Sequence, residues 1–262
     1  MNILNIIIAM NMLTNIYTTE EIMFDLLSKV DVVFIGEQHD NKFDHEIELL
    51  ILKELSKRRK VVLSLEMFEK DVQNIVDDYL QKRITEEQFL SRSRPWPNYK
   101  SDYRPLIEYA RENGIPVIAS NIPRKIANEI ARQKPISDST FLPDTVFLDD
   151  VNYKKRFFET MMKMGHVNDV NMVANYYKSQ CYKDGVMAHS IIEYLDKYPD
   201  HLIISINGNF HSDFHSGIPY QLSKINSNLK IFVITIKDQK VKNAGDFIIE
   251  RSRKSYETEA AE

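Results

Sequence analysis

The segment Asp31-Val-Val-Phe-Ile-Gly-Glu-Gln-His39 begins as an apolar run rich in β-branched residues and ends in polar ones. Similar apolar runs follow at residues 61–65, 115–119, 202–206 and 231–236. All five are nearly continuous rather than alternating, which is typical of strands buried on both faces. Helical patterns separate the runs. The sequence therefore predicts an α/β fold with a mostly parallel β-sheet flanked by helices.

The helical patterns differ in length. Residues 45–58 carry one apolar stripe after Asp44, which is the expected N-cap, and Pro123 is expected to open a helix that runs to Arg132. Two longer connections, 70–113 and 150–198, are each predicted to hold more than one helix, and the second divides near Gly165. We expect these two insertions to form a small helical cap subdomain on a single α/β domain spanning 1–262, because single cores grow to ~250–300 residues.

Composition narrows the classes of partner. The chain has 34 Lys+Arg against 38 Asp+Glu, a formal charge of −4, so no net attraction to nucleic acid is expected. Cys181 is the single cysteine, which excludes an internal disulfide and any metal site built from several cysteines. A metal ion would need His, carboxylate or Tyr ligands. The oligomeric state is not fixed by the sequence, and a homo-oligomer is one arrangement to consider.

The two ends of the chain carry weaker signals. Residues 1–13 are apolar but are interrupted by three asparagines and are too short to span a bilayer, and no transmembrane segment is predicted elsewhere. The first basic residue is Lys29, so a secretion signal lacks its basic region. We expect an N-terminal strand or ragged start and, by default, a cytoplasmic location. A degraded signal would instead imply export or membrane association. The polar tail after Glu250 is expected to be disordered.

Polar residues follow four of the predicted strands at the point where each strand ends. They are Glu37, His39, Glu66, Asn121, Arg124 and His211. Because ligands of parallel sheets bind at the carboxyl ends of the strands, these six residues are expected to line one cleft. Two Gly-x-x-His motifs begin at Gly36 and Gly208, where glycine lets the chain turn sharply after a strand. Arg124 is expected in the first turn of a helix, where the helix dipole disfavours a positive charge. An anionic partner for Arg124 is therefore favoured over simple exposure to solvent.

The chemistry of this cleft has two interpretations from the residues alone. His39 and His211 with Glu37 or Glu66 would hold a divalent metal such as zinc or manganese and leave a position for water. The same groups would otherwise act as general base and orienting residue, with Glu37 and Glu66 as the candidate catalytic carboxylates. A single histidine is more often structural, but the paired motifs favour a function.

Several further residues are looser candidates. His45 with Glu48, and His215, offer additional metal-ligand types. Gln180 and Asp184 share one face of an apolar helix, which favours a capping or inter-helix hydrogen bond. Trp96 and the neighbouring tyrosines and cations would cover a flat ligand bearing carboxylates, or would simply form a packed loop.

These motifs together resemble the ChaN-like haem-binding uptake proteins of the Tiki superfamily. The resemblance covers roughly residues 16–222 and rests on several segments in the expected order. They are Gly36-Glu-Gln-His-Asp-Asn41 with His45 and Glu48, Glu66-Met-Phe-Glu69, Tyr103-Arg-Pro-Leu106, Asn121-Ile-Pro-Arg124, Gln180 to Ala188, Gly208-Asn-Phe-His211 and Gly217-Ile-Pro219.

The resemblance implies a haem-binding protein of haem or iron uptake, with His39, Glu37, Arg124 and His211 in the pocket. Tyr or His would hold the iron and Arg or His the propionates. No motif identifies the tyrosine that would bind the haem iron. Tyr103 and Tyr220 are candidates only because they lie near the motifs in the sequence. Other superfamily members with paired Gly-x-x-His and Glu motifs are hydrolases, so the alternative is a metal-dependent hydrolase of protease or esterase type that uses His39, Glu66 and His211.

Overall fold

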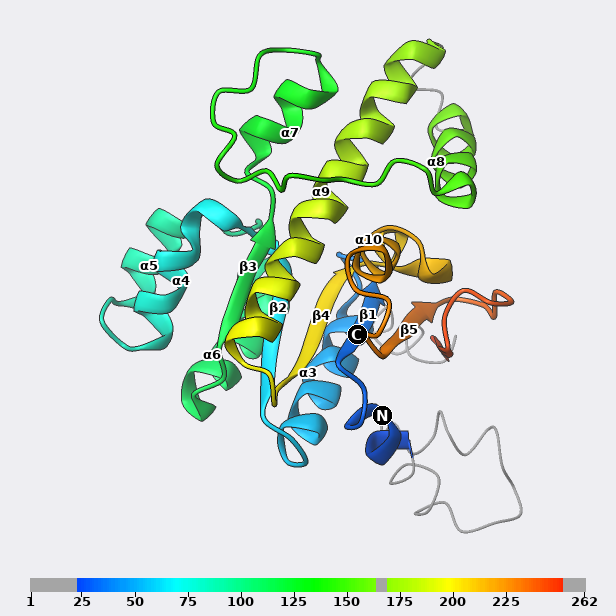
Figure 1. Cartoon of the computed structure of the whole chain (residues 1–262). Coiled ribbons are helices and arrows are strands. Elements are labelled where there is room, and N and C mark those ends of the chain that lie inside the picture. The colour runs from blue at the N-terminus through cyan, green and yellow to red at the C-terminus, as the bar shows by residue number, and fades with distance from the viewer. Residues whose placement is uncertain (1–22, 164–168, 252–262) are drawn as a thin grey trace, which may run out of the picture.

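The computed structural model describes residues 23–163 and 169–251. Within these residues one six-stranded sheet has the order β3-β2-β4-β1-β5-β6, and every pairing is parallel (Figure 1). The strands are β1 (Val32–Glu37), β2 (Val61–Glu69), β3 (Val117–Asn121), β4 (Leu202–Gly208), β5 (Ile231–Lys237) and β6 (Phe247–Glu250). The five predicted strands and the α/β class are confirmed.

Helices fill most of the connections between strands. They are α3 (Lys42–Ser56), α4 (Gln73–Leu80), α5 (Glu86–Ser93), α6 (Arg104–Asn113), α7 (Arg124–Ala131), α8 (Val151–Lys163), α9 (Val170–Lys197) and α10 (Ile218–Ile225), with short turns η1 (Lys70–Val72), η2 (Tyr99–Tyr103), η3 (Asn209–His211) and η4 (Asp213–His215). The predicted helix after Pro123 is confirmed as α7, and both long connections hold several helices as expected.

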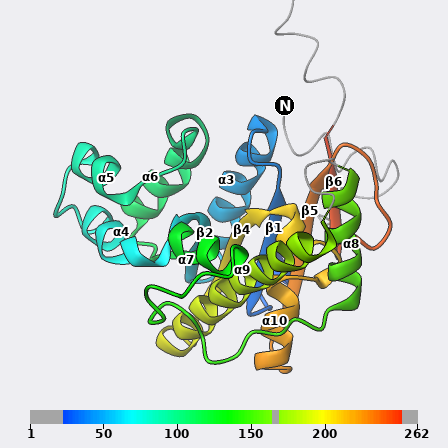
Figure 2. The same cartoon turned by 90° about the horizontal axis from the view of Figure 1, so that it is seen from above.

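Helices cover both faces of the sheet, as Figure 2 shows from above. One face packs against α3 and α6, with α4 and α5 beside them, and the other face packs against α9 and α10. Alternate residues of one strand enter the two cores: Val33 and Ile35 of β1 face α3, whereas Val32 and Phe34 face α9 and α10. Burial on both faces explains why each strand reads as a continuous apolar run.

A third group of helices extends beyond the carboxyl edge of the sheet. In Figure 1, α7, α8 and the first half of α9 stand above the tips of the strands. Tyr153 and Phe157 of α8 pack against Val173 and Tyr177 of α9 in a small core of their own. This group occupies the place expected of a cap, and the division of the chain into a domain and a cap subdomain stays a prediction. Among the described helices, none combines the length and apolarity needed to cross a membrane.

Three details differ from the expectations. Asn41, not Asp44, caps α3, because its side chain accepts a hydrogen bond from the Phe43 amide at 3.1 Å. Asp44 is instead buried and accepts hydrogen bonds from Arg251, the first residue of the tail expected to be disordered, at 2.5 and 2.6 Å. Strand β6 was not predicted, since its four residues are half exposed and too few to give a buried pattern. The N-terminal stretch 1–13 lies outside the described residues.

Candidate functional site

The carboxyl edge of the sheet brings three of the predicted residues into contact around Glu66. Strand β2 contains a bulge at this point, because Leu65 pairs with Ala119 whereas Glu69 pairs with Asn121. Bulges commonly redirect a side chain beside a functional site. Here the Glu66 carboxylate turns toward the end of β4, accepts a hydrogen bond from the Gly208 amide at 2.8 Å and lies 3.2 Å from His211 Nε2. Asn121 supports the bulge by donating to the Glu66 backbone carbonyl at 3.1 Å.

His211 is held between two buried carboxylates. Its Nδ1 donates to Asp184 of α9 at 2.5 Å, and its Nε2 faces Glu66. Burial opposes the charge of this ring, but Glu66 and Asp184 outweigh it and raise the pKa of His211 to about 10. Burial would likewise raise the pKa of Glu66, yet the His211 charge and hydrogen bond hold it at about 2. His211 is therefore a buried cation at neutral pH.

His39 forms the more accessible part of the site. Its Nδ1 lies 2.7 Å from Glu37 Oε1, and its side chain is 41% exposed. The ring lies directly against Gly208, where a Cβ would be only 2.8 Å from the ring atoms Cε1 and Nε2. Glycine at 208 thus leaves the space that His39 occupies. The two Gly-x-x-His motifs meet here, because the second motif supplies the surface on which the first histidine rests.

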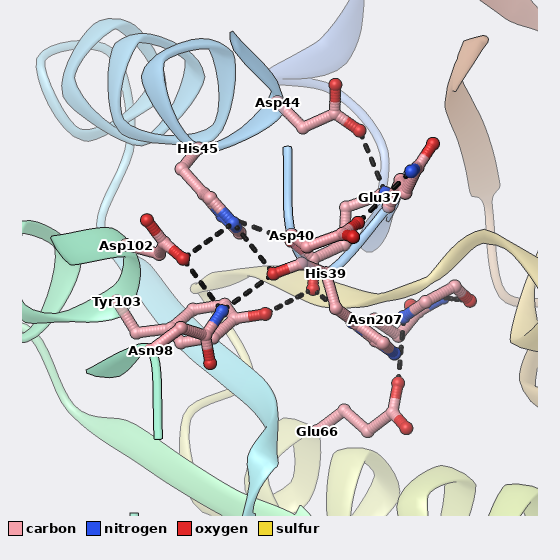
Figure 3. Close-up of polar contacts among 12 residues, drawn as sticks. Glu37, His39, Asp40, Asp44, His45, Glu66, Asn98, Asp102, Tyr103 and Asn207 are labelled. Carbon is pink, nitrogen blue, oxygen red and sulfur yellow. Dashed lines mark hydrogen bonds and ion pairs between the residues drawn. The ribbon is translucent and has the colours of Figure 1, made fainter. Parts of the chain in front are cut away.

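Glu37 connects His39 to a second polar network on the α3 side. Its Oε1 also accepts a hydrogen bond from Tyr103 at 2.8 Å, and its Oε2 lies 3.1 Å from His45 Nδ1. Figure 3 shows the His45 ring between Glu37 and Asp102. Burial opposes the charge of Glu37, but hydrogen bonds from His39 and His45 lower its pKa well below the usual range. Burial similarly opposes the charge of His45, and its carboxylate neighbours raise its pKa to about 11.

Some residues of these networks had no functional role in the sequence interpretation. Asp184 and Gln180 were expected to make a capping or inter-helix bond, and they bridge α9 to the site: Asp184 binds His211, and Gln180 lies 3.2 Å from the same ring. Asn98 donates to the His39 carbonyl at 2.7 Å. The sequence signal for Gln180 and Asp184 was their four-residue spacing on an otherwise apolar helix. No local sequence pattern indicated that Asn98 would contact the site.

A cavity of about 500 Å³ opens between the edge of the sheet and helices α7, α8 and α9. Glu66, Asn121 and Arg124 line it, and His211 adjoins it through Glu66 and Gln180. The wall combines apolar side chains, cations and one tyrosine. Its other residues are Glu69, Trp96, Ile122, Ala127, Asn128, Ala131, Phe157, Met161, Tyr176, Ser179, Gln180 and Lys183. A second hollow of about 840 Å³ shares Glu69, Trp96, Arg124 and Asn128 with it, so the two are continuous in their lining.

Comparison with protein families gives one match that contains this whole arrangement. The model described as "Haem-binding uptake, Tiki superfamily, ChaN" matches residues 23–222, which include both Gly-x-x-His motifs and helices α3 to α9. The chain belongs to this family. The ChaN family assignment confirms the resemblance seen in the motifs of the sequence.

Solved structures support the same fold for this ChaN family member. ChaN of Campylobacter jejuni, in a structure described as showing cofacial haem binding, is 20% identical with a TM-score of 0.73, over 88% of this chain and 92% of that one. The type III effector HopBA1 is 12% identical with a TM-score of 0.51, over 88% and 92%. An erythromycin esterase mutant in its open conformation is 13% identical with a TM-score of 0.50, over 84% and 73%. At these identities the likeness shows the fold alone.

A curated relative matches a smaller part of the chain. Protein RETICULATA-RELATED 5, chloroplastic, of Arabidopsis thaliana is 32% identical over 116 residues, which is 41% of this chain and 16% of that protein. This chain therefore spans about a sixth of the length of the curated relative.

Metal-ligand residue types gather at one place within the described residues. Glu37, His45 and Glu48 are all buried, and one ligand atom from each lies within 4.8 Å of the others. The predicted metal pair, His39 and His211, lies at the junction of the two networks, where Glu37 contacts His39 and both His211 nitrogens face carboxylates. A metal at that pair stays a prediction.

Alkaline pH is expected to destabilise this ChaN family member through His211. Its pKa is raised to about 10 in the folded chain, whereas an unfolded histidine titrates near ~6.5. The stabilisation from this cation is complete below about pH 6.5 and is lost as the pH rises toward the folded pKa. This one group should account for about 1.4 kcal/mol of unfolding free energy per pH unit in that window. Urea denaturation from about pH 7 to 9 should show a flatter pH dependence in His211→Gln, and equal slopes would contradict the assignment.

Proposed function

We propose that this protein binds haem in the cavity between α7, α8 and α9 and acts in haem or iron uptake or handling. The family supports haem as the ligand, and the composition of the cavity wall supports the position. A volume of about 500 Å³ falls within the ~300–1,000 Å³ usual for small-molecule sites. Haem needs a flat apolar wall, cations for two propionates and a ligand for iron.

The observation that carries this proposal is Tyr176 in the cavity wall together with two cations. Phe157, Met161 and Ile122 supply apolar surface, and Arg124 and Lys183 supply positive charge for propionates. Tyrosine is one of the residue types that hold haem iron. We therefore assign Tyr176 as the axial ligand and Arg124 as a propionate partner.

The two tyrosines nearest to the motifs fit the role of axial ligand less well. Tyr103 is fully buried with its hydroxyl donated to Glu37, and burial together with that carboxylate raises its pKa strongly, so it does not readily become a phenolate. Tyr220 lies on α10 and donates to Asp149 at 3.0 Å. Tyr176 is the tyrosine in the lining of the cavity.

The remaining predicted site residues would shape the pocket. His211 would hold Glu66 in place at the cavity wall, and Asn121 would hold the bulge that presents Glu66. Glu37 and His39 would close the adjoining edge, where His39 meets Trp96 edge-to-face at 4.7 Å between ring centroids. Nothing in these contacts favours the alternative from the sequence, a metal-dependent hydrolase using His39, Glu66 and His211.

Titration of the purified protein with hemin tests this proposal. The absorbance spectrum should show saturable binding, and Tyr176→Phe should weaken it by at least about tenfold because the phenyl ring cannot ligate iron. Tyr182→Phe is the matched control, since Tyr182 lies on the same helix and lines a different hollow. It should bind hemin as the wild type does. Equal titrations for Tyr176→Phe and wild type would remove the axial assignment, and absence of saturable binding in the wild type would overturn the function.

A further inference from the structure

Three buried side chains outside the cavity converge on one point between β1 and α3. His45 Nδ1 lies 3.1 Å from Glu37 Oε2 and 3.1 Å from Glu48 Oε2. Glu37 is the last residue of β1, and His45 and Glu48 are three residues apart on α3, which places them on the same face of the helix. The three ligand atoms lie within 4.8 Å of one another.

Hydrogen bonding around the His45 ring fixes which nitrogen faces the two glutamates. Nε2 lies 3.2 Å from the His39 carbonyl oxygen and 3.7 Å from Asp102 Oδ2, and both oxygens can only accept. Nε2 therefore carries a hydrogen, and Nδ1 points between the two glutamates, where a metal ion would replace its proton. Metal-binding histidines commonly donate their second nitrogen to a carbonyl or carboxylate in this way.

One carboxylate oxygen in this group has no hydrogen-bond partner. It is Oε1 of Glu48, a residue that is 0% exposed, whereas Glu37 Oε2 faces His45 Nδ1 at 3.1 Å. A buried, unsatisfied carboxylate oxygen is costly. Glu37 Oε1, by contrast, is engaged by both Tyr103 and His39, and these bonds leave Oε2 turned toward His45. The unsatisfied Glu48 oxygen is an observation independent of the clustering, and a bound metal ion would satisfy it.

We propose that Glu37, His45 and Glu48 bind one divalent transition-metal ion of the Zn²⁺ or Mn²⁺ class. Nitrogen and carboxylate ligands about 2.0–2.2 Å from a metal lie roughly 3.0–3.4 Å from each other at tetrahedral to octahedral angles. The observed separations of 3.1 Å match this spacing. One imidazole with two carboxylates is a donor set suited to these ions. Two carboxylates also balance a 2+ charge, so the buried group becomes neutral.

This ion would have a structural role. All three ligands are buried, and they join the end of the central strand β1 to the first turns of α3. The loop between them carries His39, whose carbonyl is bonded to His45 and whose ring contacts Gly208. Metal binding in such a closed site would stabilise the folded chain and hold this loop in place.

Metal analysis of the full chain without an affinity tag tests the site, and no haem is needed. After incubation with Zn²⁺ or Mn²⁺ and removal of free metal, mass spectrometry should find about one ion per chain. Glu48→Gln keeps the shape of the side chain but removes an anionic ligand, and should lower the bound metal by at least about tenfold. Asp213→Asn is the matched control, because Asp213 is also a buried carboxylate but is bonded to Thr235 and Lys237 instead.

A second readout covers the case in which Glu48→Gln folds poorly. Thermal unfolding of the wild type should shift to higher temperature with added Zn²⁺ or Mn²⁺ and to lower temperature after treatment with a chelator. Wild-type protein without bound metal and without these shifts would overturn the proposal, as would Glu48→Gln retaining the wild-type amount. Either result leaves the hemin titration unaffected, so the two proposals fail separately.

Discussion

Replacement of His211 by alanine should lower the free energy of unfolding by about 3–5 kcal/mol at neutral pH, because it leaves two buried carboxylates without their shared cation. Glu66 and Asp184 are both almost fully buried, and each faces one nitrogen of the His211 ring. Breaking a buried pair by removing one partner is costly because the remaining charge has no solvent to replace the lost contact. Urea denaturation followed by circular dichroism measures the change.

His215→Ala provides the comparison for His211→Ala. His215 lies four residues further on and also pairs with a carboxylate, Asp246, at 3.0 Å, but its side chain is 45% exposed. A surface ion pair contributes about 0–1 kcal/mol, so this variant should be nearly as stable as the wild type. If His211→Ala and His215→Ala lost the same free energy of unfolding, burial of the His211 ion pairs would not be the source of their stabilising effect.

Substitution of Gly217 by alanine should cost at least about 3 kcal/mol, since backbone strain and a steric clash act together. Gly217 has φ +61° and ψ −120°, a conformation that is nearly restricted to glycine. A Cβ built at this position would lie only 2.4 Å from the backbone carbonyl oxygen of His211. Because that oxygen belongs to the main chain, no side-chain rotation relieves the contact, and His211 itself would have to move.

Gly114→Ala separates the two causes. Gly114 also has a positive φ of +64°, at the C-terminus of α6, but a Cβ there meets nothing within 4 Å. Its substitution should cost only about 1–2 kcal/mol, the usual penalty of the left-handed conformation. Chemical denaturation of both variants gives the comparison. If Gly217→Ala lost no more stability than Gly114→Ala, the clash with His211 would have no energetic weight.

The strands and the position of the site could be predicted because their signals are local. Residues 32–35 are apolar, and residues 202–206 are apolar apart from Ser205, as burial on both faces of a sheet requires. The polar residues that follow them lie at one edge because parallel strands share a direction. This is why Glu66, Gly208 and His211 could be expected together before their contacts were known.

The partners of these residues could not be predicted, because they come from distant parts of the chain. Asp184 reaches His211 only because α9 crosses the edge of the sheet, and no local pattern states where a helix crosses. The local sequence around Asp44 predicts an N-cap, yet Asp44 pairs with Arg251, which is 207 positions away in the sequence. The bulge that turns Glu66 likewise depends on the pairing of β2 with β3, which single-strand patterns do not contain.

The Asp44–Arg251 ion pair has a consequence for synthesis of the chain on the ribosome. Residue 251 leaves the exit tunnel 207 residues after residue 44, and β1 must also wait for its neighbours β4 and β5. The Asp44 carboxylate accepts from the Gln38 amide as well, so the loop that holds His39 depends on this late contact. A nascent chain therefore carries its first Gly-x-x-His motif without this support until Arg251 has emerged and can reach Asp44.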